Sequence, residues 1–505
     1  MPLPGPPLQL GPWTGSVRYD LSVEEVGAHE MFDMENTRLG KSDQVESRRG
    51  TASYESEAAI SGTPTFTSVF EFRVDSSTTE VVTVAGAKIY KYSSGYSNIT
   101  GATTITAGDD NTFERVNANG TYVMTNGVDT DAIKWTGAGN ASALDDDGRF
   151  SKGKHLAWFD NRLWIGNVNG ATNQVWFSDI ADIETWGATS FFNFGGEVLG
   201  LVPMRNEVVV HTTIGIFTLI ATGNATVPYL PNQRTGVTVD AGPLAGVDGR
   251  SCVVLPNDTQ LCLLNDGVYA YAGGTEITKI SGPMDGRYWD NLNTSRLTQA
   301  FAGVFPAENE AWFVLPFGSS QTNPNSVICY NYLKDRWHGP YKGWERNCYG
   351  LLSQKPHMGG FSGQMWDHDD DSGNDDGSSI NTLAETGAPA PLGDERVKWI
   401  RARHYFDSQG NYTMTATQIG SDVDGEAEEV DLRSGGFILD QDRLDSGERL
   451  GSNTQLQQDT RLLDRSTEMS IRLANNSVSQ KWSHRKIFVR YKRLGALSKP
   501  KPVDE

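Results

Sequence analysis

Apolar and polar residues alternate along most of the chain, in pairs of short stretches joined by turns that contain Gly, Asn or Asp. This alternation predicts antiparallel strands with one buried face, because successive side chains of a strand point to opposite sides. The second stretch of each pair carries an aromatic anchor beside an aliphatic residue. Seven copies are visible, anchored at Tyr90, Trp135, Trp176, Phe217, Tyr269, Tyr330 and Trp366.

The spacing of the anchors predicts the architecture. Successive steps are 45, 41, 41, 52, 61 and 36 residues, close to the roughly 40–50 residues expected for a four-stranded propeller blade. One such sheet cannot bury its own apolar face, whereas packing against the next sheet and closing a ring does so. We therefore predict an all-β protein with a β-propeller of six or seven blades over about residues 70–380.

The stretch VWFSDIADIETWG, residues 175–187, illustrates one repeat. We expect Val175, Phe177 and Trp186 to pack between neighbouring blades. A polar turn is a far more common role for Ser and Asp in this pattern than an active site. The residues assigned to the turn are Ser178, Asp179 and Asp182.

The segments that flank the repeats have a different composition. Residues 1–70 begin rich in Pro and Gly and then become polar, which predicts an N-terminal arm or a strand pair that completes a sheet. Residues 391–505 contain short alternating stretches and a basic tail, which predicts a small β-sandwich-like domain. Residues 71–390 are then the propeller.

Composition narrows the functional classes. The net charge of −20 over 505 residues argues against a surface that grips phosphates, because nucleic-acid affinity comes from Lys and Arg. No basic region precedes an apolar one near the start, and no long apolar run predicts a membrane span. The four cysteines lack CxxC or zinc spacing, so we interpret them as reduced core thiols of a protein made in a cytoplasm. They are Cys252, Cys262, Cys329 and Cys348.

GRFSKGKH, residues 148–155, nearly matches a phosphate-binding loop, with Gly148, Gly153 and Lys154 at the right spacing. His155 stands where a Ser or Thr is required to bind Mg²⁺, and no helical pattern follows. A surface turn between blades is the better interpretation.

DHDDDSGNDDG, residues 367–377, resembles a calcium loop in part. Asp367, Asp369 and Asp371 fit an EF-hand, but Ser372 and Ser378 occupy the positions of its Gly and Glu. We expect a solvated acidic hairpin, with adventitious Ca²⁺ as the alternative.

The sequence predicts no catalytic residue, no cofactor-binding residue and no resident metal ion, so we do not expect an enzyme. The motifs HExxH and GxSxG are absent from the sequence. Paired carboxylates for glycoside hydrolysis stay open, because such partners lie far apart in sequence. The histidines are His29, His155, His211, His338, His357, His368, His404 and His484.

Charge is segregated near the C-terminus. Ten acids and two arginines, Arg433 and Arg443, lie between Asp422 and Glu448, and residues 481–500 contain seven basic residues and no acid. Pairing of oppositely charged strands within one domain explains this layout. The alternative is docking between neighbouring subunits through basic residues such as Arg490 and Arg493, where charge fixes register more than affinity.

Several segments occur in an order that points to one family. They are GPWTGSVRYDLSV, RLGKSDQVESRRG, LAWFDNRLWIGNVNGATNQVWFSDIADIETW, EVVVHTTIGIFTLIATGN, FSGQMWDHDDDSGNDDGSSINTLAETG and VKWIRARHYFDSQGNYTM. Taken together, they resemble the tail hub or nozzle proteins of short-tailed bacteriophages, which stabilise packaged DNA. The long acidic hairpin departs from the family pattern and leaves the shape of the channel tip open.

The resemblance implies a structural virion protein of the tail, assembled in the bacterial cytoplasm. It implies a homo-oligomeric ring, six copies in relatives, that contacts the portal and adaptor complex and tail fibre or needle proteins. The ring would form the DNA exit channel, retain the packaged genome and conduct it during ejection without specific binding and without a membrane partner. The family supplies no catalytic residues.

Two other functions stay open. Trp-rich blades also form sugar platforms, so a carbohydrate-binding or glycan-cleaving propeller for host attachment is the main alternative; 13 Trp residues permit it. A cellular propeller scaffold that binds peptides as a monomer is the third. The Pro-rich arm and the separate charged domain favour assembly over both.

Overall fold

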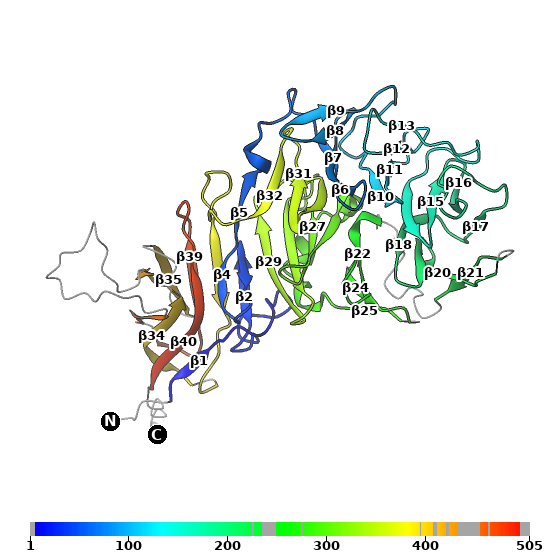
Figure 1. The fold of residues 1–505 in the computed structure, drawn as a ribbon. Coiled ribbons are helices and arrows are strands. Elements are labelled where there is room, and N and C mark those ends of the chain that lie inside the picture. The colour runs from blue at the N-terminus through cyan, green and yellow to red at the C-terminus, as the bar shows by residue number, and fades with distance from the viewer. Residues whose placement is uncertain are drawn as a thin grey trace, which may run out of the picture.

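The computed structural model describes residues 6–224, 227–234, 249–274, 276–393, 395–407, 412–420, 424–432, 455–462 and 465–494. Strands dominate it, as predicted (Figure 1). Its helical elements are short 3-10 turns, and no helix in the described ranges is long and apolar enough to cross a membrane. The 3-10 turns are η1 (Tyr54–Ser56), η3 (Gly249–Ser251), η4 (Gly282–Met284), η5 (Trp289–Asn291) and η6 (Thr294–Gln299).

Seven four-stranded antiparallel sheets, numbered here 1–7 in chain order, form the larger part of the described structure. Each predicted anchor lies on the third strand of its own sheet, which confirms the repeat pattern. Sheets 1–3 consist of β6 (Phe66–Arg73), β7 (Thr79–Ala85), β8 (Lys88–Tyr92) and β9 (Tyr96–Asn98); β10 (Glu114–Ala118), β11 (Thr121–Thr125), β12 (Ile133–Trp135) and β13 (Ser142–Ala143); β14 (His155–Phe159), β15 (Arg162–Val168), β16 (Ala171–Phe177) and β17 (Phe191–Asn193).

The remaining four sheets follow the same order. Sheets 4 and 5 consist of β18 (Val198–Pro203), β19 (Glu207–Thr212), β20 (Gly215–Ala221) and β21 (Tyr229–Gln233); β22 (Cys252–Val254), β23 (Gln260–Leu264), β24 (Gly267–Tyr271) and β25 (Thr278–Lys279). Sheets 6 and 7 consist of β26 (Phe301–Phe305), β27 (Glu310–Leu315), β28 (Ser326–Asn331) and β29 (Arg336–Lys342); β30 (Cys348–Leu352), β31 (Lys355–Gly359), β32 (Met365–Asp370) and β5 (Gly50–Ser53).

The seven sheets are arranged in the manner of a propeller. The first strand of each sheet contacts the first strand of the next, from β6 through β10, β14, β18, β22 and β26 to β30, and β30 contacts β6 again. Neighbouring sheets bury apolar side chains against one another. Each sheet therefore covers the face that it could not bury alone.

Most of the stretch 175–187 has the predicted roles, but Ser178, which we assigned to the turn, is fully buried and its hydroxyl accepts a hydrogen bond from the Leu163 backbone at 3.0 Å. Val175 and Phe177 belong to a cluster of buried side chains shared by sheets 3 and 4, and Trp186 belongs to one shared by sheets 2 and 3. Asp179 and Asp182 form the turn, where Asp182 accepts hydrogen bonds from the Glu184 backbone and the Thr185 hydroxyl. The structure thus assigns this stretch to packing and a turn.

Strand β5 of the N-terminal arm completes sheet 7. It pairs antiparallel with β32, so Trp366 faces Ser53 and Asp370 faces Gly50. A Cβ atom on Gly50 would lie 2.0 Å from the Asn374 carbonyl oxygen, so only glycine fits this crossing. Sheet 7 therefore combines one strand from the N-terminal arm with three strands that lie about 300 residues later in the sequence.

Two further sheets, here the two-sheet unit, lie beside the propeller-like part (Figure 1). One has the order β3-β4-β40-β34-β37, with β1 on β40 and β38 on β34; the other has the order β2-β33-β39-β35-β36. The strands are β1 (Leu8–Leu10), β2 (Met31–Glu35), β3 (Thr37–Leu39), β4 (Val45–Ser47), β33 (Thr382–Thr386), β34 (Val397–Asp407), β35 (Thr413–Gly420), β36 (Asp424–Asp431), β37 (Gln455–Arg461), β38 (Arg465–Ser466), β39 (Met469–Asn475) and β40 (Ser483–Arg493).

The arm and the two-sheet unit share strands. Strands β1 to β4 all come from the arm, and β33 comes from the range assigned to the propeller, yet all five belong to the two-sheet unit. The reason is burial: Trp13 of the arm and Trp399 of β34 lie in one apolar cluster that continues into Phe313 of sheet 6. The arm therefore gains its apolar contacts from both parts of the molecule. The basic tail after residue 494 lies outside the described residues.

Candidate functional site

The apparent phosphate-binding loop is a turn between sheets 2 and 3. His155 begins β14 and is buried, and its Nδ1 lies 2.7 Å from Glu114 Oε1. A Cβ on Gly153 would lie 2.3 Å from Ile165 Cγ2, so this glycine serves close packing. The predicted interpretation as an inter-blade turn is confirmed.

The acidic hairpin, residues 367–377, is only partly the solvated hairpin that we expected, because Asp371 and Asp376 are exposed but Asp369 and Asp375 are half-buried. Three of its carboxylates form short ion pairs with basic residues from distant parts of the chain, and Asp367 lies 3.9 Å from Lys355. The three pairs join Asp369 to Arg49 at 2.8 Å, Asp371 to Lys481 at 2.6 Å and Asp375 to Arg48 at 2.5 Å. The sequence pattern could not show these partners, because Arg48 and Arg49 precede the hairpin by more than 300 residues.

Arg48 is the most enclosed cation at this junction, because only 2 % of its side chain is exposed. Its Nη1 donates to Asp375 Oδ1 at 2.8 Å, its Nε donates to Asn36 Oδ1 at 2.9 Å, and its guanidinium lies 4.2 Å from the Trp344 ring centroid. A cavity of about 400 Å³ opens here between the arm, sheet 7 and the segment that leads to β33. Arg48 therefore links three segments that are distant in sequence.

Arg346 lines the same cavity. Burial is the main reason that the pKa of Arg346 is lowered to about 9. Its Nε donates to His368 Nε2 at 3.1 Å. Burial, followed by the nearby arginines, holds the pKa of His368 well below its usual range, so this histidine is a neutral acceptor. The hydrogen bond ties His368 of the acidic hairpin to Arg346, which lies just before β30 of sheet 7.

Glu310 forms a second buried polar cluster, in sheet 6. Its Oε1 lies 3.2 Å from His338 Nε2, and its Oε2 accepts a hydrogen bond from Trp312 Nε1 at 2.8 Å. Burial opposes the charge of Glu310, but the charge and hydrogen bond of His338 and the charge of Arg38 outweigh it and lower the pKa of Glu310 to about 2. The carboxylate is therefore held in its ionised form.

This pKa predicts a pH dependence of stability. A carboxyl group with a lowered pKa in the folded state stabilises the protein above its unfolded pKa of about 4.5, and this stabilisation is lost as the pH falls towards 2. We expect Glu310→Gln to lower the free energy of unfolding by about 3 kcal/mol at pH 7. Urea unfolding at pH 7, 5, 4 and 3 checks this: the difference from wild type should shrink below pH 4.5, and a constant difference would contradict the assignment.

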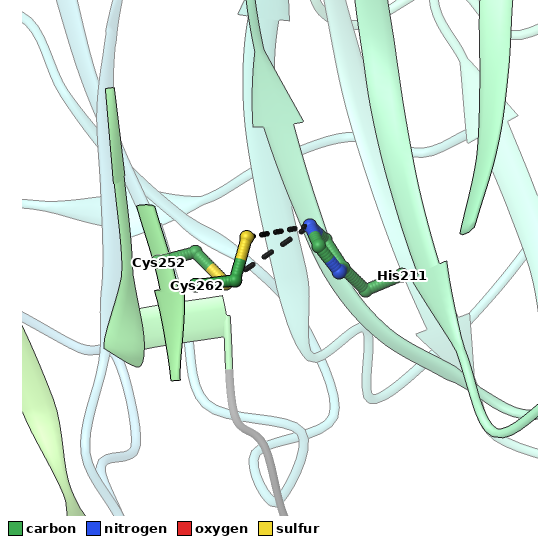
Figure 2. Close-up of side chains that lie close together, drawn as sticks. All are labelled: His211, Cys252 and Cys262. Carbon is green, nitrogen blue, oxygen red and sulfur yellow. Dashed lines mark hydrogen bonds between the residues drawn. The ribbon is translucent and has the colours of Figure 1, made fainter. Parts of the chain in front are cut away.

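Seven of the eight histidines are buried, and only His29 is exposed. One of the seven, His211, faces two cysteine sulfurs: its Nε2 is 3.8 Å from Cys262 Sγ and 4.0 Å from Cys252 Sγ (Figure 2). Sequence spacing gave no signal for this cluster, because His211 is in sheet 4 and the cysteines are in sheet 5. All four cysteines lie in described residues; Cys252 is half-buried, the other three are buried, and none forms a disulfide.

The tryptophans bear on the sugar-platform alternative. All 13 lie in described residues; 11 are buried and the other two, Trp158 and Trp366, are half-buried. A sugar platform needs an exposed aromatic face, and among the Trp residues only these two side chains are partly exposed. The high Trp content is therefore explained mainly by packing between strands, as the 11 buried side chains show.

The predicted charge segregation is only partly described. Most of the acidic run lies outside the described residues, since only 424–432 of it is placed. Arg490 and Arg493 on β40 are exposed, and Arg493 lies 3.6 Å from Glu395. On the neighbouring strands, Arg403 holds Asp459 at 2.7 Å. Basic side chains of β40 thus remain at the surface.

Comparisons with known proteins give a fold likeness only. No protein-family model and no curated protein matches the sequence. An extracellular domain from B. thetaiotaomicron matches with a TM-score of 0.45 at 7% identity, over 90% of this chain and 64% of that one. A streptogramin B lyase and a virginiamycin B lyase from Staphylococcus aureus match with TM-scores of 0.43 and 0.41, each at 10% identity over 63% of this chain and 97% of theirs. These low identities and scores carry no argument about function.

Proposed function

We propose that this chain is a structural, non-enzymatic protein of a bacteriophage tail. Several copies would form the hub or nozzle ring that retains the packaged genome and conducts the DNA during ejection. In this proposal the seven sheets are the blades of one closed propeller, and the two-sheet unit is the β-sandwich-like domain attached to it.

One observation carries the proposal. The segments that resemble tail nozzle proteins fall on the joints of this fold as well as on its repeats. RLGKSDQVESRRG, residues 38–50, contains β4 and leads into β5, and FSGQMWDHDDDSGNDDGSSINTLAETG, residues 361–387, contains β32 and β33. These two segments contact each other through Arg48, Arg49 and Gly50 and connect the two parts, so the residues that carry the resemblance also hold the arm to the rest of the molecule.

Charge supports a conduit rather than a DNA-binding surface. Six copies with a charge of −20 each carry −120 in total. An acidic lumen would repel DNA phosphates over a Debye length of about 8 Å at physiological salt. Low friction suits passage of a genome better than affinity does.

Electron microscopy of the purified full chain, and of tails from virions, tests the proposal. We expect a rotationally symmetric ring, sixfold as in the relatives, with a channel wide enough for duplex DNA. Because ring proteins often need a preformed partner to assemble, the protein in tail preparations is the decisive sample. Virion tails that lack this chain would overturn the proposal, and so would a ring whose central channel is too narrow for duplex DNA.

A further inference from the structure

The His211 cluster brings together donor atoms from two neighbouring sheets. His211 is on β19 of sheet 4, while Cys252 and Cys262 are directly opposite each other on β22 and β23 of sheet 5. His211 and Cys262 are almost fully buried, and Cys252 is half-buried. Figure 2 shows both sulfurs directed at the same ring nitrogen. The three side chains therefore converge on one point between the sheets.

The distances suit a small thiophilic cation. The imidazole nitrogen and the two sulfurs all lie within 4.8 Å of one another, and the two measured sulfur-to-nitrogen distances are 3.8 and 4.0 Å. Around a tetrahedral Zn²⁺, with Zn–S of about 2.3 Å and Zn–N of about 2.0 Å, such ligands are about 3.6 Å apart. Shifts of a few tenths of an ångström, within reach of side-chain rotation, would complete the coordination.

Gln260 supplies a fourth donor. Its amide Nε2 lies 2.7 Å from His211 Nε2, and its Oε1 is buried without a hydrogen-bond partner. An amide N–H can only donate, so His211 Nε2 is the unprotonated nitrogen, as a metal ligand must be. Rotation of the amide about its last bond would place Oε1 against the cluster, where an oxygen can bind a cation. The unpartnered oxygen is thus an independent sign of a ligand.

A similar trio in sheet 6 lacks these properties. Glu310, Cys329 and His338 also lie within 4.8 Å of one another. There, both Glu310 oxygens and both His338 nitrogens already have hydrogen-bond partners, including the Tyr341 hydroxyl. That cluster is satisfied by its own hydrogen bonds, whereas the His211 cluster lies beside a buried oxygen without a hydrogen-bond partner, Gln260 Oε1.

We propose that His211, Cys252, Cys262 and Gln260 bind one Zn²⁺ ion that links sheets 4 and 5. On binding, both thiols lose their protons to solvent and the sulfurs bind as thiolates. Neither the zinc ion nor the sulfurs change oxidation state. All four positions are filled by protein atoms, which is the arrangement of a structural rather than a catalytic zinc. The site goes beyond the proposed tail function and does not depend on it.

The test measures metal in the full-length protein kept under a non-thiol reductant. Protein equilibrated with zinc and then dialysed is expected to retain about one Zn²⁺ per chain, and Co²⁺ in its place should give the thiolate charge-transfer and visible bands of a tetrahedral site. Cys252→Ser is the first variant, because its half-buried side chain makes misfolding less of a risk. Cys348→Ser is the matched control, because this buried cysteine of sheet 7 is remote from the cluster.

Metal retention and the Co²⁺ spectra distinguish a zinc site from buried thiols that bind no metal. Loss of the Co²⁺ bands and of retained zinc in Cys252→Ser and His211→Gln, with both retained in Cys348→Ser, supports the site. Wild-type protein that retains less than about a tenth of an ion per chain, or Co²⁺ spectra unchanged in Cys252→Ser, would overturn it. If His211→Gln does not fold, Gln260→Ala provides the second test, through weaker zinc retention and altered Co²⁺ bands.

Discussion

Arg336→Ala is expected to lower the free energy of unfolding by about 4 kcal/mol. Only 1% of the Arg336 side chain is exposed. From β29 in sheet 6, its guanidinium donates to the backbone carbonyls of Trp13, Leu39 and Gly40 at 2.6 to 3.0 Å and pairs with Asp43 at 3.0 Å. Removing the guanidinium leaves three backbone carbonyl oxygens of the arm without this donor. Each buried carbonyl oxygen that loses a hydrogen bond lowers the free energy of unfolding.

Lys334→Ala is the matched control. Lys334 pairs with the same Asp43 carboxylate at 2.5 Å, but 33% of its side chain is exposed. An exposed pair contributes under about 1 kcal/mol, so the loss in this variant should be small. Urea unfolding followed by tryptophan fluorescence measures both variants, and Arg336→Met separates the lost hydrogen bonds from the lost packing volume. Equal losses in Arg336→Ala and Lys334→Ala would show that the buried guanidinium does not hold the arm.

The second large effect is expected at the acidic hairpin. Arg48→Ala should lower the free energy of unfolding by about 4 kcal/mol, because it removes one partner of a largely buried ion pair and leaves Asp375 without its cation. The same change removes the hydrogen bond to Asn36 and the contact with the Trp344 ring. Since β5 begins two residues after Arg48, we also expect the strand that completes sheet 7 to unfold more readily than in the wild type.

Arg49→Ala tests whether the burial of the arginine side chain, rather than its charge alone, decides how much the free energy of unfolding falls. Arg49 is adjacent in sequence, and its Nη1 donates to both carboxylate oxygens of Asp369 at 2.8 Å. Its side chain, however, is 40% exposed. Its removal should cost about 1–2 kcal/mol, less than the removal of Arg48, because Arg49 itself is solvated although its partner Asp369 is only 11% exposed. Unfolding curves, together with limited proteolysis after residue 48 or 49 as a local probe, compare the two variants. A larger loss for Arg49→Ala than for Arg48→Ala would contradict the prediction.

The repeat was predictable because its signal is local. Alternation within each strand pair reflects one buried and one less buried face, and the seven aromatic anchors all fall on the third strands of their sheets. The turn at Asp179 and Asp182 was predictable for the same reason, since side-chain hydrogen bonds to nearby backbone form turns without help from distant residues.

The partners of the arm were not predictable. Short stretches such as β3 and β4 contain too few residues for a pattern, and their pairing is decided by the apolar surface available beside them. Trp13 illustrates this, because its burial depends on the two-sheet unit. Residues 1–70, which we interpreted as one segment, therefore contain strands that join three different sheets.

The candidate sites also divide into those that depend on local sequence and those that depend on contacts between distant residues. Local reasoning rejected the phosphate loop at Gly148 and Lys154, because a required residue and a helix were missing from the sequence. It missed the ion pairs of the acidic hairpin, since Arg48 lies more than 300 residues away. It also interpreted Cys252 and Cys262 as core thiols, because nothing in their spacing points to His211 on another sheet.

By itself, the sequence determined the all-β class, the repeated strand pairs and the acidic charge of this protein. These properties follow from side-chain periodicity and composition, which each segment carries on its own. Only the tertiary structure decided that β5 completes sheet 7, that the arm supplies β1 to β4 to the two-sheet unit, and that His211 meets two cysteines. Such contacts join segments far apart along the chain, and packing selects them from many pairings that the sequence alone permits.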